Sequence, residues 1–103
     1  MRRLGLGPAV RQDRPASELV HDEANVRVVA FHLLPGQEIP PHRSDSTVLV
    51  QVVAGSGTFT GDGSELELSA GDSAVFAPGE LHAIRAPAVP LRFVAIITPR
   101  PGG

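Results

Sequence analysis

Proline and glycine interrupt this chain so often that no long helix fits between them. Ten prolines and eleven glycines are spread over 103 residues, and proline lacks the N–H that a helix interior requires. Apolar residues also do not recur at the i, i+3, i+4, i+7 spacing of an amphipathic helix over three turns. We therefore predict an all-β protein.

The segments between these breaks are typical of short strands, because they are rich in β-branched residues or alternate in polarity. In the segment ELELS, Leu66 and Leu68 are predicted to face the core, with Glu65 and Glu67 facing out. An Asp-Gly pair just before it predicts a hairpin. The predicted strands are 17–21, 25–34, 47–54, 58–60, 65–69, 73–77, 81–86 and 91–97.

Many short strands without a helix predict a sandwich or a barrel, and a closed barrel or double-sheet jelly roll hides its strand edges. A barrel this small is either filled by side chains or holds one small ligand. We expect one barrel domain over residues 16–98, a flexible N-terminal segment at 1–15 and a C-terminal tail at 99–103.

Composition excludes several classes of chemistry. The chain has no cysteine, so it forms no disulfide and offers no thiolate. All nine basic residues are arginine, which excludes a Schiff-base lysine. The arginines are interspersed with acidic residues, which argues against nucleic-acid binding. No apolar run approaches the roughly 18 residues of a membrane span, and the N-terminus lacks the apolar core of a secretory signal. The cytoplasm is therefore the expected location.

Two glycines and one histidine flank the longest apolar run at a recognisable spacing. Gly36 is followed by five residues and then His42, and the set closes at Gly55. This spacing resembles the first motif of the cupin superfamily. In that family a second histidine and a glutamate complete the motif, and here those two positions hold Ser44 and Val48.

A second set resembles the other cupin motif. It begins at Gly71, continues with Gly79 and ends on His82. Ala77 and Ala86 stand where the family has proline and asparagine. The phrases VLVQVVAGSGTF and AGDSAVFAPGELHAI also look like small single-domain cupins.

The resemblance covers about residues 25–97 and implies a double-stranded β-helix. It implies that the two motif histidines project into the barrel mouth, and that homodimers are common. One fold hosts many functions. The relatives include metal-dependent dioxygenases, isomerases and lyases, sugar epimerases without metal, and ligand-binding or sensor modules.

Strand alternation predicts which side chains share the cavity. If His42 points inward, Ser44 does so too, and Val48 and Val50 follow unless a bulge resets the register. On the last motif strand His82 and Ile84 share one face. The candidate lining residues are Ser44, Val48, Val50, Gln51, Phe76 and Ile84, although for Gln51 alternation favours the opposite face.

Two neutral imidazoles are good ligands for iron, manganese, nickel, copper or zinc. A catalytic metal site usually needs three protein ligands and one open position. The candidate ligands are His42 and His82, with His32 as the foremost third ligand and Glu38, Asp45 or Gln51 as others. The alternative is a hydrogen-bonded histidine pair that holds no metal, with or without a role in proton transfer.

Three functions follow from these alternatives. The first is a small-molecule-binding barrel whose metal site is partly degenerate. The second is a metal-dependent enzyme of the dioxygenase, lyase or isomerase type that uses His42, His82 and a substitute ligand. The third is a structural domain whose barrel is filled and has no cavity.

Overall fold

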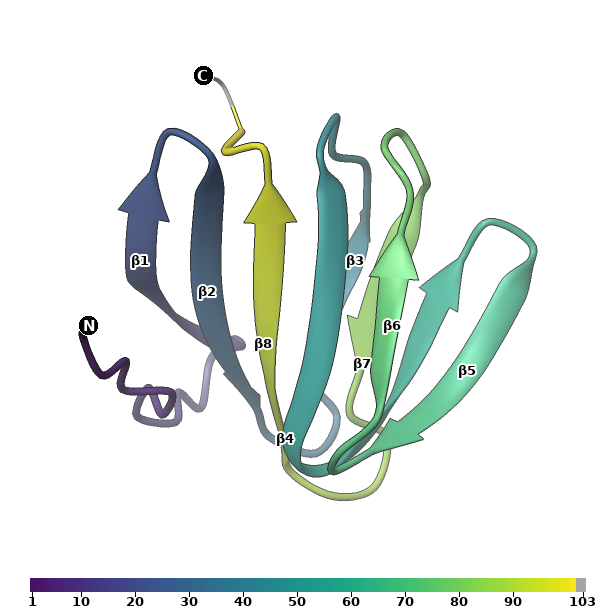
Figure 1. The fold of residues 1–103 in the computed structure, drawn as a ribbon. Coiled ribbons are helices and arrows are strands. Elements are labelled where there is room, and N and C mark those ends of the chain that lie inside the picture. Colours follow the sequence, from purple (N-terminus) through teal and green to yellow (C-terminus); the bar gives the residue numbers. More distant parts are fainter. Residues whose placement is uncertain (102–103) are drawn as a thin grey trace.

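The computed structural model describes residues 1–101, which contain eight strands and no helix. All strand pairs are antiparallel, and the strands curl into an open half-barrel (Figure 1). The strands are β1 (Ala16–Glu23), β2 (Val26–Leu33), β3 (Glu38–His42), β4 (Thr47–Gly61), β5 (Ser64–Ser69), β6 (Ser73–Phe76), β7 (His82–Arg85) and β8 (Leu91–Thr98). The double-stranded β-helix predicted from the sequence is therefore the observed architecture.

The strand order is β1-β2-β8-β4-β7-β3, and β5 and β6 also pair with β4. The first half of β4 pairs with β6 and β8, in a sheet that we call sheet A together with β1 and β2. The second half of β4 pairs with β5 and β7, in a sheet that we call sheet B together with β3. The chain passes from sheet A to sheet B at Gly55, whose φ is 75°.

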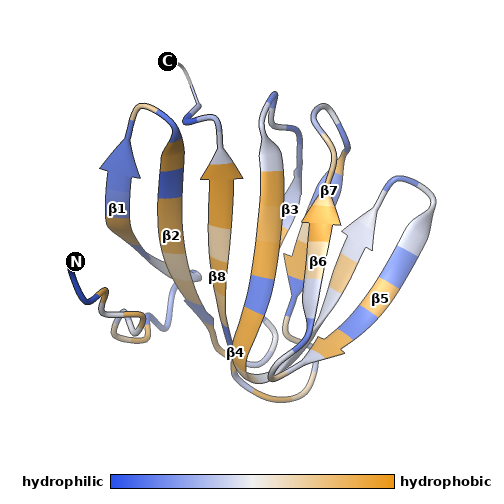
Figure 2. Ribbon diagram, in the orientation of Figure 1, coloured by the Kyte–Doolittle hydropathy of each residue, from blue (hydrophilic) through white to orange (hydrophobic). Residues whose placement is uncertain are grey.

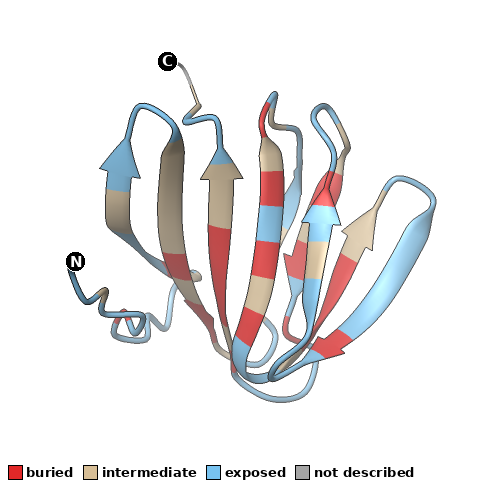
Figure 3. Cartoon of the chain, viewed as in Figure 1, coloured by how far each residue is buried: buried red, intermediate tan, exposed pale blue. Residues whose placement is uncertain are grey.

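The core lies between the two sheets. Burial alternates along the first half of β4, where Val48, Val50 and Val52 are buried between more exposed neighbours (Figure 3). The ring of Phe93 stacks on Phe31 with centroids 4.7 Å apart and meets Phe59 edge-on at 5.4 Å. Orange apolar segments accordingly dominate β4 and β8, whereas β5 alternates between apolar and polar residues (Figure 2).

Two strand predictions were wrong in detail. The segments 47–54 and 58–60 are one strand, β4, because Gly55 bends the chain without ending its pairing. Strand β3 was missed because Pro40 and Pro41 interrupt its pattern. Proline is tolerated there since β3 is an edge strand, paired only with β7. Leu68 is buried as predicted, but Leu66 is 51% exposed.

The N-terminal segment 1–15 contains no strand, but it contacts the barrel. Pro8 is buried, and its carbonyl lies 3.3 Å from Nδ1 of His32. The carbonyl of Arg11 accepts a hydrogen bond of 2.7 Å from the side chain of Gln37. Of the predicted C-terminal tail, residues 102–103 lie outside the described part of the chain. Residues 1–101 include no helix long and apolar enough to cross a membrane.

Candidate functional site

An open cavity of about 520 Å³ lies between the sheets at one end of the barrel. We call this end the mouth; it carries the β3–β4 loop, the β6–β7 loop and the chain after β8, at the top of Figure 1. The wall is almost entirely apolar, and its polar side chains are two histidines and one serine. The lining residues are Phe31, Ile39, Pro40, Pro41, His42, Ser44, Val48, Val50, Phe76, His82, Ile84, Phe93, Ala95, Ile97 and Pro101.

The two motif histidines face each other across the β3–β7 ladder. His42 and His82 are direct register partners, so their side chains leave the sheet on the same face. Their ring centroids are 4.1 Å apart and the ring planes meet at 66°. His82 is buried, whereas His42 stands at the exposed edge of the cavity. The pair therefore gives the cavity one polar end in an apolar wall.

Both rings are held by the same kind of hydrogen bond. Nδ1 of His42 donates to the carbonyl of Pro40 at 3.1 Å, and Nδ1 of His82 donates to the carbonyl of Glu80 at 3.0 Å. Because a carbonyl oxygen only accepts, each Nδ1 carries the ring proton. In the neutral form each Nε2 therefore keeps a free lone pair, which can accept a hydrogen bond or bind a cation.

Burial favours the neutral form of His82. Burial lowers the pKa of His82 below its usual value of 6.5, and the nearby His42 lowers it further, while the Glu80 carbonyl bond and carboxylate oppose this. The ring also stacks on Phe76, with centroids 4.4 Å apart and planes inclined by 20°. A neutral, stacked ring is suited to accepting a hydrogen bond at Nε2.

The loop before His82 is fixed by Glu80, a residue whose place in the sequence predicts only a solvent-facing turn. Its carboxylate accepts hydrogen bonds from the backbone N–H groups of Ala77 at 2.9 Å and Asp62 at 3.2 Å. Its carbonyl holds the His82 ring. Glu80 is thus a positioning residue, and its place just after the Pro78-Gly79 turn was the available signal.

The two altered motif positions both lie on the cavity. Val48 is buried in the wall and offers no ligand atom. Ser44 lies at the mouth, where its Oγ accepts a hydrogen bond of 3.1 Å from the backbone N–H of Ser46. The structure also places Val50 and Ile84 along the cavity, on the faces that alternation gives them, and Phe76 lines it as well.

Two candidate residues do not reach the cavity. His32 lies on the opposite face of β2, because its neighbour Phe31 takes the inner face and stacks on Phe93. The ring of His32 is buried there beside the carbonyl of Pro8. Gln51 likewise faces outward, and its amide donates to the carbonyl of Gly71 at 3.3 Å. Neither residue completes a site with His42 and His82.

The residues present do not form a three-ligand metal centre. Within residues 1–101, no three His, Cys, Asp or Glu side chains gather in a way that could hold a metal ion. Of the remaining candidates, Glu38 pairs with Arg85 in the β3–β7 register, away from the histidine pair, and Asp45 lines a neighbouring hollow outside the cavity. The donor set at the mouth is two imidazoles and a hydroxyl.

Comparison with known proteins settles the family. Residues 29–97 match the family described as the cupin domain, which is more than half of the chain. This protein therefore belongs to the cupin family, as its motif spacing predicts. No curated protein matches the chain significantly.

Solved structures agree with this assignment. An RmlC-like cupin protein from Desulfovibrio desulfuricans is 32% identical, with a TM-score of 0.83, and the match covers 96% of this chain and 97% of that one. An uncharacterized conserved protein with a double-stranded β-helix domain from Klebsiella pneumoniae is 28% identical, with a TM-score of 0.85 and coverage of 93% and 86%. The DMSP lyase DddQ from Ruegeria pomeroyi, at 20% identity, a TM-score of 0.78 and coverage of 93% and 54%, shares the fold.

Proposed function

We propose that this cupin binds a small, largely apolar organic molecule in the mouth cavity, with His42 and His82 as its polar contacts. The observation that carries the proposal is an open cavity of about 520 Å³ with an apolar wall and two histidines at one end. Concave sites of roughly 300–1,000 Å³ with few polar groups are typical of small-molecule binding. A barrel filled by its own side chains, the third alternative, would have no such space.

The two rings define the polar chemistry that the ligand needs. In its neutral form each of the two rings presents an unprotonated Nε2, because its Nδ1 is bonded to a backbone carbonyl. This end of the cavity can therefore accept a hydrogen bond from a hydroxyl or another donor on the ligand. Its apolar body would lie against Val50, Ala95 and Ile84.

A cavity-filling variant tests the proposal. Val50 points into the cavity, and its register partners on both sides are alanines, Ala74 and Ala95, so Val50→Phe would place a ring in the empty space. Val53→Phe is the matched control, because Val53 lies on the same strand and is 45% exposed. Overpacking usually lowers folding stability by about 1–3 kcal/mol. If Val50→Phe does not fold, Ala95→Leu fills the same space and takes its place in the test.

The measurement is isothermal titration calorimetry with a neutral probe, 3-phenylpropan-1-ol, and with 1-octanol. We expect both the natural protein and Val53→Phe to bind at least one probe. Val50→Phe is expected to lose at least about tenfold in affinity, since its ring occupies the site. Equal affinity in all three proteins, or binding in none, would refute a ligand-binding cavity.

The second candidate function is a metal-dependent enzyme of the dioxygenase, lyase or isomerase type. One observation favours it: metal-ligating histidines usually donate their other ring nitrogen to a carbonyl or carboxylate, as both rings do here. The donor set opposes it, because Ser44 is a poor ligand and Val48 is none. Two imidazoles leave a metal short of the usual third protein ligand.

Elemental analysis separates the two candidates. The protein is incubated with manganese, iron, nickel, copper or zinc, passed through a desalting column and compared with His82→Ala and with His32→Ala as the control. The binding-module proposal predicts no metal that depends on His82. Close to one metal per chain, lost in His82→Ala and kept in His32→Ala, would favour the enzyme.

The predicted homodimer is supported by the outer face of sheet A. Leu49 pairs with Val75 on one side and Ile96 on the other, and Ile96 pairs with Val28. Leu49 and Val75 are 38% and 59% exposed. We call this row of Val28, Leu49, Val75 and Ile96 the outer apolar row, and propose that a second copy of the chain covers it.

A further inference from the structure

Beside the cavity mouth lies a second hollow of about 460 Å³ that is rich in charge. It shares the lining residues Ser44 and Pro101 with the cavity, so the two spaces adjoin there. Its other lining residues come from the β3–β4 loop and from the chain after β8. They are Arg43, Asp45, Ser46, Pro99 and Arg100.

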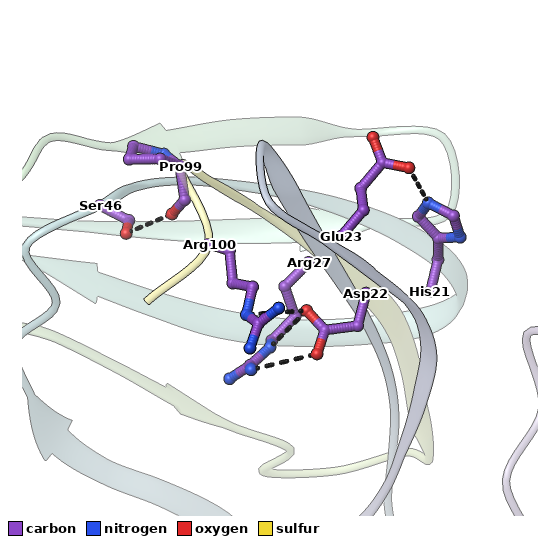
Figure 4. A network of polar contacts seen from close by, with 7 residues as sticks. All are labelled: His21, Asp22, Glu23, Arg27, Ser46, Pro99 and Arg100. Carbon is purple, nitrogen blue, oxygen red and sulfur yellow. Dashed lines mark hydrogen bonds and ion pairs between the residues drawn. The ribbon is translucent and has the colours of Figure 1, made fainter. Parts of the chain in front are cut away.

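The two walls of this hollow are tied together. The buried hydroxyl of Ser46 donates to the carbonyl of Pro99 at 2.6 Å, which fixes the chain after β8 against the β3–β4 loop (Figure 4). Arg43 donates to the carbonyl of Gly79 at 2.8 Å, and the backbone N–H of Gly79 donates to the carbonyl of Ser44 at 2.7 Å. The hollow is therefore a fixed feature of the mouth.

Arg100 retains donors that its protein partner does not use. Its Nε lies 3.6 Å from Asp22, beyond normal hydrogen-bond length, although the two groups are close enough to form an ion pair. Both carboxylate oxygens of Asp22 already accept hydrogen bonds of 3.3 Å from Arg27 (Figure 4). The Arg27 bonds, followed by the charge of Arg100, lower the pKa of Asp22. One carboxylate thus faces two guanidinium groups, and one positive charge is left over.

The remaining groups at the mouth also favour an anion. Arg43 also lines the hollow, where Asp45 is the single acidic lining residue, and the Arg43 guanidinium donates to the carbonyl of Gly79 beside it. The Ser44 hydroxyl accepts from Ser46, so its own proton is available for a further acceptor. Among the residues that line the hollow, the two arginines Arg43 and Arg100 stand against one carboxylate, Asp45, so the lining itself carries one net positive charge.

We propose that the ligand of the cavity is an apolar carboxylic acid, whose carboxylate lies in the hollow beside Ser44, Arg43 and Arg100 while its apolar body lies in the cavity. Guanidinium groups recognise carboxylates through paired, charge-assisted hydrogen bonds. This inference rests on the proposed ligand-binding function and adds the charge of the ligand to it. It also gives a role to the serine that stands at the second motif-histidine position.

The test compares two probes with the same apolar body, 3-phenylpropanoate and 3-phenylpropan-1-ol. Calorimetry is run on the natural protein, on Arg43→Gln and Arg100→Gln, and on Arg14→Gln as a control at an exposed arginine outside both spaces. We expect the natural protein to bind the carboxylate at least about fivefold more tightly than the alcohol. Each mouth variant should lose most of this preference and keep its affinity for the alcohol, whereas Arg14→Gln keeps both.

Other outcomes overturn the inference in distinguishable ways. Equal affinity for the two probes in every protein would refute the carboxylate site and leave the cavity function standing. A carboxylate preference that survives both arginine variants and is lost in His42→Gln would place the anion at the histidine pair, which also refutes this site. Binding of neither probe to the natural protein would refute the cavity function and this inference together.

Discussion

Replacing Gly55, at the corner where β4 passes between the sheets, should lower the stability of the fold by an amount that the local geometry allows us to estimate. Gly55 has a φ of 75°, and a Cβ built there would lie 1.8 Å from the carbonyl oxygen of Pro90 and 2.9 Å from its carbon. Both atoms belong to the backbone, so the contact cannot be relieved by a side-chain rotation. Gly55→Ala must therefore move β4 away from the start of β8, at the point where the chain passes between the sheets.

Gly79→Ala is the control that separates the cost of a left-handed backbone from the cost of the overlap with Pro90. Gly79 has a φ of 80°, nearly the same, but a Cβ at this position would have no neighbouring atom within 4 Å. A left-handed conformation costs an alanine about 1–2 kcal/mol, which is the loss that we expect at Gly79. At Gly55 the overlap adds about 1–3 kcal/mol more, so the total loss should be about 2–5 kcal/mol.

Chemical denaturation in urea measures both losses on the same scale. The midpoint should fall for both variants, and much further for Gly55→Ala, with little change in the slope. Equal losses for the two variants would refute the claim that close approach to Pro90 is what requires glycine at this corner.

Two further predictions concern the site and the outer face. Burial depresses the pKa of His82 below its unfolded value near 6.5. The unfolded chain therefore binds more protons than the folded protein at acidic pH. Folding stability should then fall as the pH drops from about 7 through the folded pKa. Denaturation at several pH values should show a shallower fall in His82→Gln, and identical profiles would contradict this. Separately, Leu49→Glu should convert a homodimer to a monomer in light scattering, whereas Glu18→Gln should not; an unchanged mass in Leu49→Glu would contradict the proposed interface.

The strands that were predictable are those whose pattern is strong. The apolar runs that became β2, β4 and β8, and the alternating segment that became β5, were recognised because burial on one or both faces leaves a clear signal. Strand β3 leaves no such signal, because its two prolines are more typical of a loop. They are tolerated in a strand here because β3 lies at an edge of the sheet. The alternation of β5 likewise gives no sign that Leu66 is exposed while Leu68 is buried, because that difference depends on tertiary packing.

The site residues that could be predicted are those whose positions are determined by the spacing of the two motifs. Spacing pointed to His42 and His82, and the structure places them opposite each other. It could not decide the direction of His32, because both faces of β2 carry apolar residues and alternation is ambiguous there. The arginines at the mouth were missed for another reason: Arg43 and Arg100 are far apart in the chain, and they line one hollow because β4 pairs with β8, Thr47 with Thr98, and Ser46 bonds to Pro99.

Nitrogen-15 NMR of the histidine rings tests the central claim most directly. We predict that His42 and His82 both carry their proton on Nδ1, and that their Nε2 signals shift when 3-phenylpropan-1-ol is added, while those of His32 on the far face of β2 do not. Rings protonated on Nε2, or Nε2 signals of His42 and His82 that stay unchanged at saturating probe, would contradict a cavity whose polar end is this histidine pair.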